Sequence, residues 1–383
     1  MKTMIPPNPL KNLIEEKGTL CLSIILPTNR YVGFRMLNSG VLKKGFKQAS
    51  QLLENRKYPE DKKKILQHKL KDVFRNIPPG KLKDGIGLFL SEKISETVIF
   101  PFPVEEKIVM DQSFEIRDLI TLEDYFAPFY VLSLSKKIVH LYSIRGDILS
   151  EVKDNNFPSE FIDDYEYSKP GPGSAKYPSP KSFERDKSNL EEMRQISFLK
   201  KTDEALQNYV NSSIPFMVYA PKEIISNFKN ITQNSSFLMG SIPGQIIKTN
   251  TPKLIQQCRK VFKTSKEIEC QNILKRLEEE FGNKMVAAGI ENVWAEVHRG
   301  NNLILIVEKN YRERVYFEKN KIHMSPPVRD YNIAVDAVDD LIELNYKKGG
   351  KILFTEDQTL KNFNHIALLL RYKNEFIRKP HPV

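Results

Sequence analysis

Apolar positions follow two different periods along the first third of the chain. The run LCLSIILPT (20–28) is almost continuously apolar and ends at a proline, which predicts a buried strand. In residues 39–56 and again in 59–77, apolar side chains recur about one helical turn apart, so we predict a pair of helices. Two short strands are predicted next, within 85–103. Together these elements predict a small α+β domain over residues 1–125.

The pattern changes in the middle of the chain. Residues 128–152 contain short apolar runs separated by the sequences SKK and RGD, which predicts an antiparallel meander with these sequences as turns. A long helix is predicted over about 183–211, and alternating strands and helices follow it, the last of them a helix over 251–262. A meander followed by βα units predicts a mixed sheet flanked by helices, the element order of ribonuclease-H-like domains. We assign this domain to residues 126–265.

The last third repeats the alternation of helices and strands. Helical spacing predicts one helix in 265–282 and another in 284–300, and we interpret Trp294 as part of the apolar core face of the second. Strands and a further helix follow, and that helix is predicted to end at the pair Gly349-Gly350. These elements predict an α/β sandwich domain over residues 266–383.

A loop rich in proline and glycine, residues 165–182, interrupts the predicted middle domain. Its segment KPGPGSAKYPSP (169–180) holds four prolines, two glycines and two lysines, so neither a helix nor a strand can run through it. Two interpretations stay open. The segment is either a disordered surface loop without a partner, or a stiff loop that loses little entropy when it becomes ordered in an RNA groove.

The positive charge of the chain is concentrated in one segment. The chain has 59 Lys and Arg against 48 Asp and Glu, a formal net charge of +11. Between Arg30 and Lys83 there are fifteen basic and four acidic residues, and fifteen minus four is again +11. A solvated helical face explains any single lysine cluster in this segment. The concentration of the whole excess there favours a partner with a phosphate backbone.

Candidate catalytic groups are scarce. There is no glycine-rich phosphate loop and no nucleophile elbow, and the six histidines and three cysteines lack metal-ligand spacing. The histidines are His68, His140, His298, His323, His365 and His381, and the cysteines are Cys21, Cys258 and Cys270. We therefore expect no catalytic residue, no metal and no cofactor. Sparse unpaired cysteines and the lack of a signal-peptide pattern or a long apolar run predict a soluble cytoplasmic protein.

Three segments resemble a known family. The strongest is NYKKGGKILFTEDQTLKNFNHIALLLRYK (345–373), and MVAAGIENVWAEVHRGNNLILIVE (285–308) and NIPPGKLKDGIGLFLSE (76–92) add to it. They are similar to segments of the third and first domains of the archaeo-eukaryotic peptide chain release factor and Pelota family, in its bacterial branch. The resemblance implies the same three-domain order, with a third domain like the kink-turn-binding ribosomal protein superfamily.

The functional motifs of the release factors are missing. Where the resemblance places the Gly-Gly-Gln loop, this chain has Gly171-Pro172-Gly173-Ser174, and Pro172 lacks an N–H and restricts the backbone. The pair Gly244-Gln245 lies at the end of a predicted strand instead. The nearest match to the Asn-Ile-Lys-Ser codon-reading motif is Leu37-Asn38-Ser39-Gly40, and the tyrosine-cysteine signature is also absent. The resemblance therefore implies a factor that neither reads stop codons nor releases peptide.

The leading hypothesis is a non-catalytic, tRNA-mimicking factor that binds the ribosomal A site, as in ribosome hibernation by Balon-like relatives. The resemblance implies contacts with rRNA of both subunits and delivery by elongation factor Tu, and we expect a monomer without a membrane partner. Candidate rRNA-binding residues on the decoding side are Lys43, Lys44, Lys47, Lys62, Lys63 and Lys64. Candidates on the peptidyl-transferase side are Lys169, Pro170, Gly171, Pro172, Gly173, Ser174 and Lys176.

Two other classes of function stay open. One is an enzyme, a ribosome rescue or release factor that hydrolyses peptidyl-tRNA, with Ser174 or another group of the loop positioning water. The other is a binding module of a stress response that keeps the fold but does not act on the ribosome.

Overall fold

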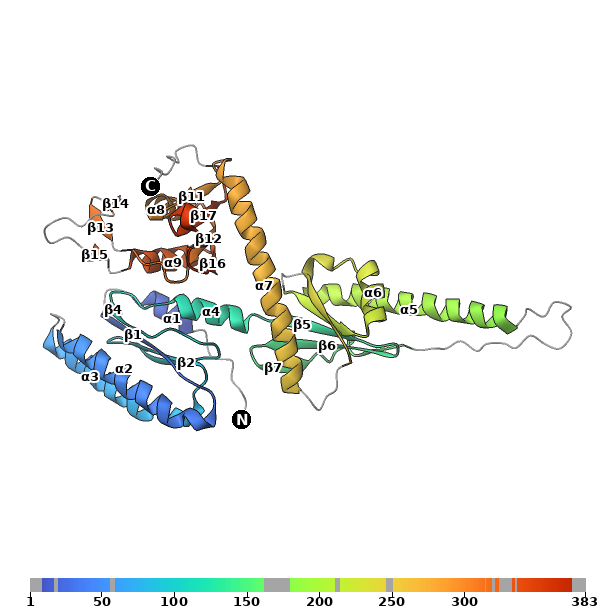
Figure 1. Cartoon of the computed structure of the whole chain (residues 1–383), viewed down its shortest axis with the longest axis horizontal. Helices are drawn as coiled ribbons and strands as arrows, with labels where there is room; N and C mark the ends of the chain where they lie inside the picture. Colours follow the sequence, from blue (N-terminus) through green and yellow to red (C-terminus); the bar gives the residue numbers. More distant parts are fainter. Residues whose placement is uncertain are drawn as a thin grey trace. The chain divides into compact units, whose positions relative to one another are not determined.

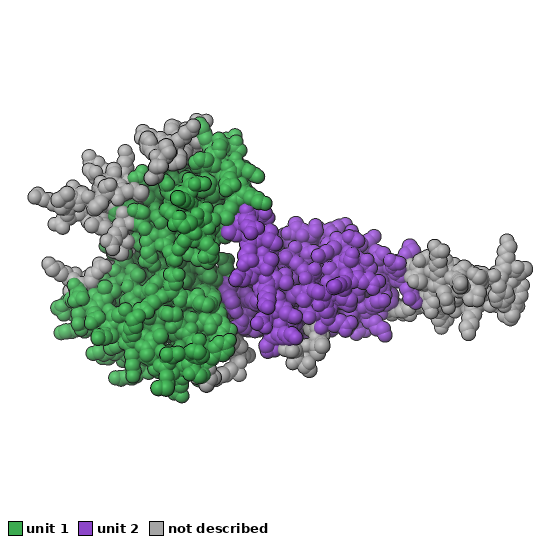
Figure 2. All heavy atoms as spheres, in the orientation of Figure 1, with its two compact units in different colours: residues 1–124, 273–383 green, residues 125–272 purple. Residues whose placement is uncertain are grey.

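The structure is a computed structural model, which describes ten ranges of the chain (Figure 1). They are residues 9–16, 20–55, 59–161, 180–210, 214–245, 251–313, 315–318, 321–323, 333–334 and 336–373. The chain forms two compact units (Figure 2). Unit 1 combines residues 1–124 with 273–383, and unit 2 consists of residues 125–272. The multidomain mixed α/β fold that the sequence predicts is confirmed.

The first sheet of unit 1 is antiparallel, with the strand order β3-β2-β1-β4. Its strands are β1 (Cys21–Pro27), β2 (Gly85–Leu90), β3 (Ser95–Phe100) and β4 (Lys107–Asp111). The neighbouring helices are α1 (Pro9–Glu15), α2 (Arg35–Asn55), α3 (Glu60–Asn76) and α4 (Arg117–Phe126). Every residue of β2 is buried, and β1 is buried up to its last residue, so both strands read as apolar runs.

The helices α2 and α3 form the predicted hairpin. Their buried positions include Leu42, Ala49 and Leu53 on α2 and Leu66 and Leu70 on α3, spaced four or seven residues apart. These side chains join the sheet residues in one hydrophobic core. The opposite helix faces stay exposed to solvent, which is where the exposed lysines lie.

The later part of unit 1 contains two more sheets. The larger has the order β11-β17-β12-β16, formed by Val286–Ala288, Ile366–Leu370, Asn302–Glu308 and Lys351–Thr355. The smaller has the order β14-β13-β15, formed by Lys321–His323, Val315–Glu318 and Ile333–Ala334. The helices α8 (Ile290–Arg299) and α9 (Ala337–Lys347) contact the larger sheet. The predicted end of α9 is confirmed, since Gly349 has φ +71° and its N–H donates to the Tyr346 carbonyl oxygen at 2.9 Å.

Two local predictions in this part are wrong. The helix expected over 284–300 begins only at Ile290, because residues 286–288 form β11 and pair with β17. Trp294 is only partly buried and stacks on His298 with ring centroids 4.8 Å apart, so it is not a core residue. The buried face of α8 is formed by neighbours such as Val293 and Val297 instead.

Unit 2 contains a mixed sheet with the order β10-β9-β5-β6-β7, and β8 also pairs with β6. The strands are β5 (Phe129–Leu134), β6 (Ile138–Arg145), β7 (Ile148–Glu151), β8 (Ser159–Glu160), β9 (Phe216–Ala220) and β10 (Leu238–Pro243). The strands β5, β9 and β10 are parallel, whereas β5, β6 and β7 form the predicted antiparallel meander. The RGD sequence is its β6–β7 hairpin turn, where Gly146 has φ +58°.

Helices cover both faces of this sheet. The helices α5 (Pro180–Val210) and α6 (Lys222–Ile231) supply one hydrophobic cluster, and α7 (Thr251–Phe281) supplies the other. The sequence predicts two helices, over 251–262 and 265–282, but α7 is one continuous helix. The predicted boundary between residues 265 and 266 lies inside it, and the division into three domains stays a prediction.

No helix in the described ranges is both long enough and apolar enough to span a membrane.

Candidate functional site

Three of the candidate lysines on the decoding side are exposed and have no partner among the described residues. Lys43 and Lys47 lie one turn apart on α2, and Lys64 lies on α3. Within the described part of the chain, none of their ammonium groups forms an ion pair or a hydrogen bond. These lysines therefore remain available to a phosphate group from outside.

The other three candidate lysines have partners inside the chain. The Nζ of Lys44 lies 2.9 Å from a carboxylate oxygen of Glu106, and the Nζ of Lys62 lies 2.6 Å from Glu92. Lys63 is only 8% exposed. Its Nζ donates to Glu60 at 3.1 Å and to the carbonyl oxygen of Glu54 at 3.5 Å. The ammonium group of Lys63 therefore helps to join the facing ends of α2 and α3. An RNA contact by any of the six lysines stays a prediction.

The buried Lys63 and the exposed Lys64 are expected to contribute differently to the stability of the fold. Lys63→Ala is expected to lower the free energy of unfolding by about 1–2 kcal/mol, because it removes two internal hydrogen bonds and a buried aliphatic stem. Lys64→Ala is the matched control, with an expected change within about 0.5 kcal/mol, since its side chain is exposed. Urea unfolding monitored by far-ultraviolet circular dichroism compares the two. Equal effects would mean that Lys63 has no internal role.

The second candidate set, Lys169 to Lys176 in the proline-rich loop, lies outside the described residues. Among the described motif residues, Asn38 of the sequence Leu37-Asn38-Ser39-Gly40 is 3% exposed. Its amide donates to the carbonyl oxygens of Asn29 at 2.9 Å and Pro79 at 3.2 Å. This sequence lies at the start of α2, and Asn38 stabilises the connection before it. Gly244 directly follows β10, at the strand end that the sequence predicts.

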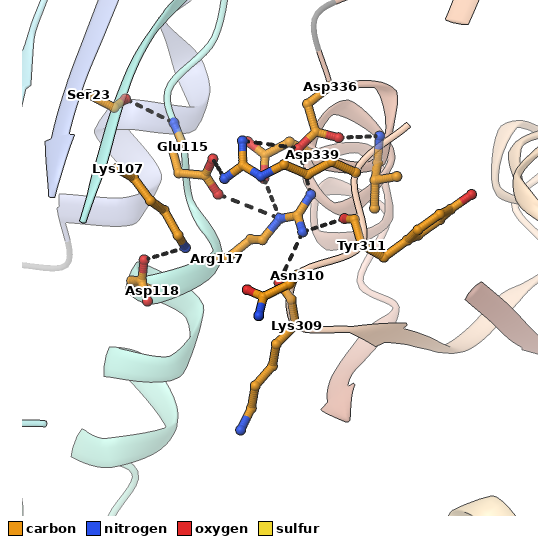
Figure 3. Close-up of polar contacts among 12 residues, drawn as sticks. Ser23, Lys107, Glu115, Arg117, Asp118, Lys309, Asn310, Tyr311, Asp336 and Asp339 are labelled. Atoms are coloured by element: carbon orange, nitrogen blue, oxygen red, sulfur yellow. Dashed lines mark hydrogen bonds and ion pairs between the residues drawn. The ribbon is translucent and has the colours of Figure 1, made fainter. Parts of the chain in front are cut away.

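A buried cluster of charged groups that the sequence patterns did not predict lies within unit 1 (Figure 3). Arg117, the first residue of α4, is 4% exposed and lies among three carboxylates. Its Nη2 donates to Asp336 at 2.7 Å and its Nε donates to Asp339 at 3.3 Å. The Nε also lies 3.5 Å from a carboxylate oxygen of Glu115. Figure 3 shows these side chains pointing toward one another.

The remaining donors of Arg117 contact the backbone. Its Nη1 donates to the carbonyl oxygens of Tyr311, at 2.6 Å, and Lys309, at 3.2 Å. A second guanidinium, that of Arg312, donates to Glu115 at 2.8 Å and lies 3.7 Å from Asp336. Because residues 115–117 follow the first sheet and residues 309–339 belong to the later part, this Arg117 cluster joins the two parts of unit 1.

The electrostatics of the Arg117 cluster depend on burial. When all of them are ionised, three carboxylates face two guanidinium groups, an excess of one negative charge. Burial and the neighbouring Glu115 raise the pKa of Asp339 well above its usual range, although Arg117 opposes the shift. Burial also raises the pKa of Asp336, against the attraction of Arg117 and Arg312. Burial alone would lower the pKa of Arg117, but the three carboxylates outweigh it and raise that pKa.

The Arg117 cluster suits a structural role. Asp336 also accepts a hydrogen bond from the Val338 N–H at 3.1 Å and so caps α9, and each carboxylate of the cluster contacts a guanidinium. Among the described residues, no group of histidines, cysteines and carboxylates could hold a metal ion. The sequence did contain a signal, because Arg117, Asp336 and Asp339 stand among apolar residues at helical spacing. Such charges in an apolar pattern indicate buried partners.

One comparison with known proteins matches the middle part of the chain to a family. The model of a family described as bacterial archaeo-eukaryotic release factor family 3 matches residues 128–301. The matched segment, residues 128–301, is thus similar to the family that the sequence resemblance predicts. No curated protein matches it.

Solved structures of archaeal and yeast proteins are similar to the chain at low identity. The archaeal translation termination factor aRF1 is 16% identical, with 95% of this chain and 96% of that chain covered and a TM-score of 0.26. Pelota of Archaeoglobus fulgidus is 15% identical, with 74% and 77% covered and a TM-score of 0.32. Dom34 of S. cerevisiae, a translation termination-like factor, is 13% identical, with 79% and 76% covered and a TM-score of 0.39.

Proposed function

We propose that the protein binds the ribosomal A site without catalysing peptide release and protects the ribosome during hibernation. The observation that carries this proposal is the α2–α3 hairpin, which exposes Lys43, Lys47 and Lys64 without partners among the described residues. The match of residues 128–301 to a release-factor family supports it. Unpaired exposed lysines gain most from phosphate contacts, since no internal ion pair has to be broken. The hairpin would contact rRNA near the decoding centre.

The lack of catalysis is supported by the loop sequence. Gly171-Pro172-Gly173-Ser174 contains no glutamine, and Pro172 cannot donate a backbone hydrogen bond to water or substrate. In this proposal Lys169 and Lys176 contact rRNA on the peptidyl-transferase side while the loop performs no chemistry. Delivery by elongation factor Tu belongs to the same proposal.

Two measurements on the full-length protein test the proposal. Co-sedimentation with vacant ribosomes should occur at low salt, should weaken steeply as salt rises, and should be lost when a tRNA occupies the A site. Ribosomes that carry peptidyl-tRNA should retain the peptide when the protein is added. Failure to co-sediment at low salt would contradict ribosome binding. Peptide release that disappears when residues 169–180 are deleted would instead establish a hydrolytic rescue or release factor.

A further inference from the structure

Large apolar side chains are unusually exposed at the connection between β1 and α2. Tyr31, Phe34, Met36 and Leu37 are 68%, 40%, 87% and 61% exposed, respectively. They are four of the eleven large apolar residues that are exposed in the described part of the chain, and they fall within seven consecutive positions. We call these four residues the aromatic tip. A cluster of this kind indicates a binding surface, because scattered single residues would need no explanation.

Hydrogen bonds hold the backbone of the aromatic tip in place. The Tyr31 N–H donates to the side-chain oxygen of Asn29 at 3.0 Å, and the Phe34 N–H donates to the Tyr31 carbonyl oxygen at 3.0 Å. Asn38, which is buried, joins Asn29 to Pro79. Arg30 forms an ion pair with Asp84 and donates to the Pro101 carbonyl oxygen at 2.9 Å. The apolar side chains are therefore exposed by a defined turn, and a ligand pays little ordering entropy there.

The surroundings of the aromatic tip are basic. Arg35 is exposed and lies against Gly80, and the neighbouring Lys81 is exposed as well. Asp84 is already paired with Arg30. Met36, Lys43 and Lys47 are seven and four residues apart, so they lie along one face of α2. With a rise of about 1.5 Å per residue, the unpaired lysines begin about 10 Å from Met36.

From this arrangement we infer that the aromatic tip stacks on an unpaired base of RNA, whose phosphates continue along Lys43 and Lys47. Tyr and Phe rings stack on bases of any sequence, and phosphate groups are attracted by the nearby arginine and lysines. A partner protein with an uncharged apolar surface would gain nothing from the basic residues around the aromatic tip. The inference rests on the proposed function only in taking the natural partner to be ribosomal RNA.

Binding of a short RNA tests the aromatic tip directly. The full-length protein is titrated into a fluorescently labelled single-stranded RNA of twelve nucleotides and into the matching duplex, at several salt concentrations. Single-stranded RNA should bind more tightly. Tyr31→Ser with Phe34→Ser should raise its Kd about tenfold or more, without changing the salt dependence. Tyr31→Phe should bind as the original protein does. Tyr372→Ser is the matched control, because Tyr372 is also 73% exposed and should not matter.

The outcomes separate the two proposals. An unchanged Kd for the double variant, or an equal loss in Tyr372→Ser, would overturn the aromatic tip as an RNA site. The RNA site would also be overturned if the double variant no longer bound ribosomes but still bound the RNA with unchanged Kd. The aromatic tip would then bind a ribosomal protein. RNA binding through the tip without any ribosome binding would refute the proposed function alone. Circular dichroism verifies that the double variant is folded.

Discussion

Arg117→Met is expected to lower the free energy of unfolding by about 3–5 kcal/mol, because it leaves buried carboxylates without their main counter-charge. Glu115, Asp336 and Asp339 are each less than 9% exposed and cannot regain water without disrupting the fold. Methionine keeps most of the apolar volume of the arginine side chain. The loss in the free energy of unfolding therefore measures the charge and the hydrogen bonds of the guanidinium. Urea unfolding of the full chain, followed by circular dichroism, gives the difference. A loss below 1 kcal/mol would contradict the role assigned to Arg117.

Arg312→Met is the matched control for this prediction. The Arg312 side chain is 36% exposed, donates a hydrogen bond to Glu115 and lies farther, 3.7 Å, from Asp336, so water replaces part of its interaction. We expect a loss of about 1–2 kcal/mol, clearly smaller than that of Arg117→Met. Equal losses would show that the stability of the cluster does not depend on burial of the guanidinium.

The pH dependence of the same measurement has a definite sign. The raised pKa of Asp339 means that, at pH values between its unfolded and its folded pKa, the folded chain binds more protons at this group than the unfolded chain does. The stability from this group is therefore fully present below the unfolded pKa, about 3.9, and is lost as the pH rises through the folded pKa. Arg117→Met strengthens this effect, because the guanidinium that lowers the pKa is gone. The deficit of the variant should shrink as the pH falls from 7 toward 5, and a constant deficit would contradict this account.

Reversing three charges on the hairpin should weaken ribosome binding about a hundredfold at low salt. The variant combines Lys43→Glu, Lys47→Glu and Lys64→Glu, and each lysine contributes a charge-assisted contact of about 1 kcal/mol or more. Loss of three phosphate contacts should also make the salt dependence of log K shallower by about 2–3. Because all three side chains are exposed and have no ion pair within the described ranges, the fold should be unaffected. Co-sedimentation across a salt series measures both effects.

A control with the same change in net charge separates local contacts from overall attraction. Lys136, Lys222 and Lys361 are exposed residues outside the hairpin, so their replacement by glutamate changes the charge equally. This control should lose much less affinity and keep the original salt dependence. If both variants lose affinity equally, binding depends only on net charge and the hairpin is not the contact surface.

The sequence alone predicted the features that depend on neighbouring residues. The apolar spacing over residues 39–77 predicts the helical hairpin, because a helix buries every third or fourth side chain. The pair Gly349-Gly350 predicts the end of α9, since glycine adopts positive φ at little cost. In the same way the RGD sequence predicts a hairpin turn. The concentration of positive charge in residues 30–83 can also be counted directly from the sequence.

Pairing between distant segments was decided only by the tertiary structure. Residues 286–288 suit a helix or a strand, and they become β11 because β17 supplies backbone partners there. The separate helices predicted over 251–262 and 265–282 form one helix, α7. No glycine or proline interrupts it from 253 to 281, so here the sequence itself contained the signal.

The charged groups show the same division between sequence and tertiary structure. The sequence gives the number of lysines on the hairpin, but it does not separate Lys63, which contacts α2, from the exposed Lys64. Arg117 is separated by more than two hundred residues from the two aspartates that neutralise it, and only folding brings them together. Local spacing thus determined which residues form helices and where the charge lies. Contacts between distant residues decided which charges are buried and which are left for a partner, because burial depends on the whole fold.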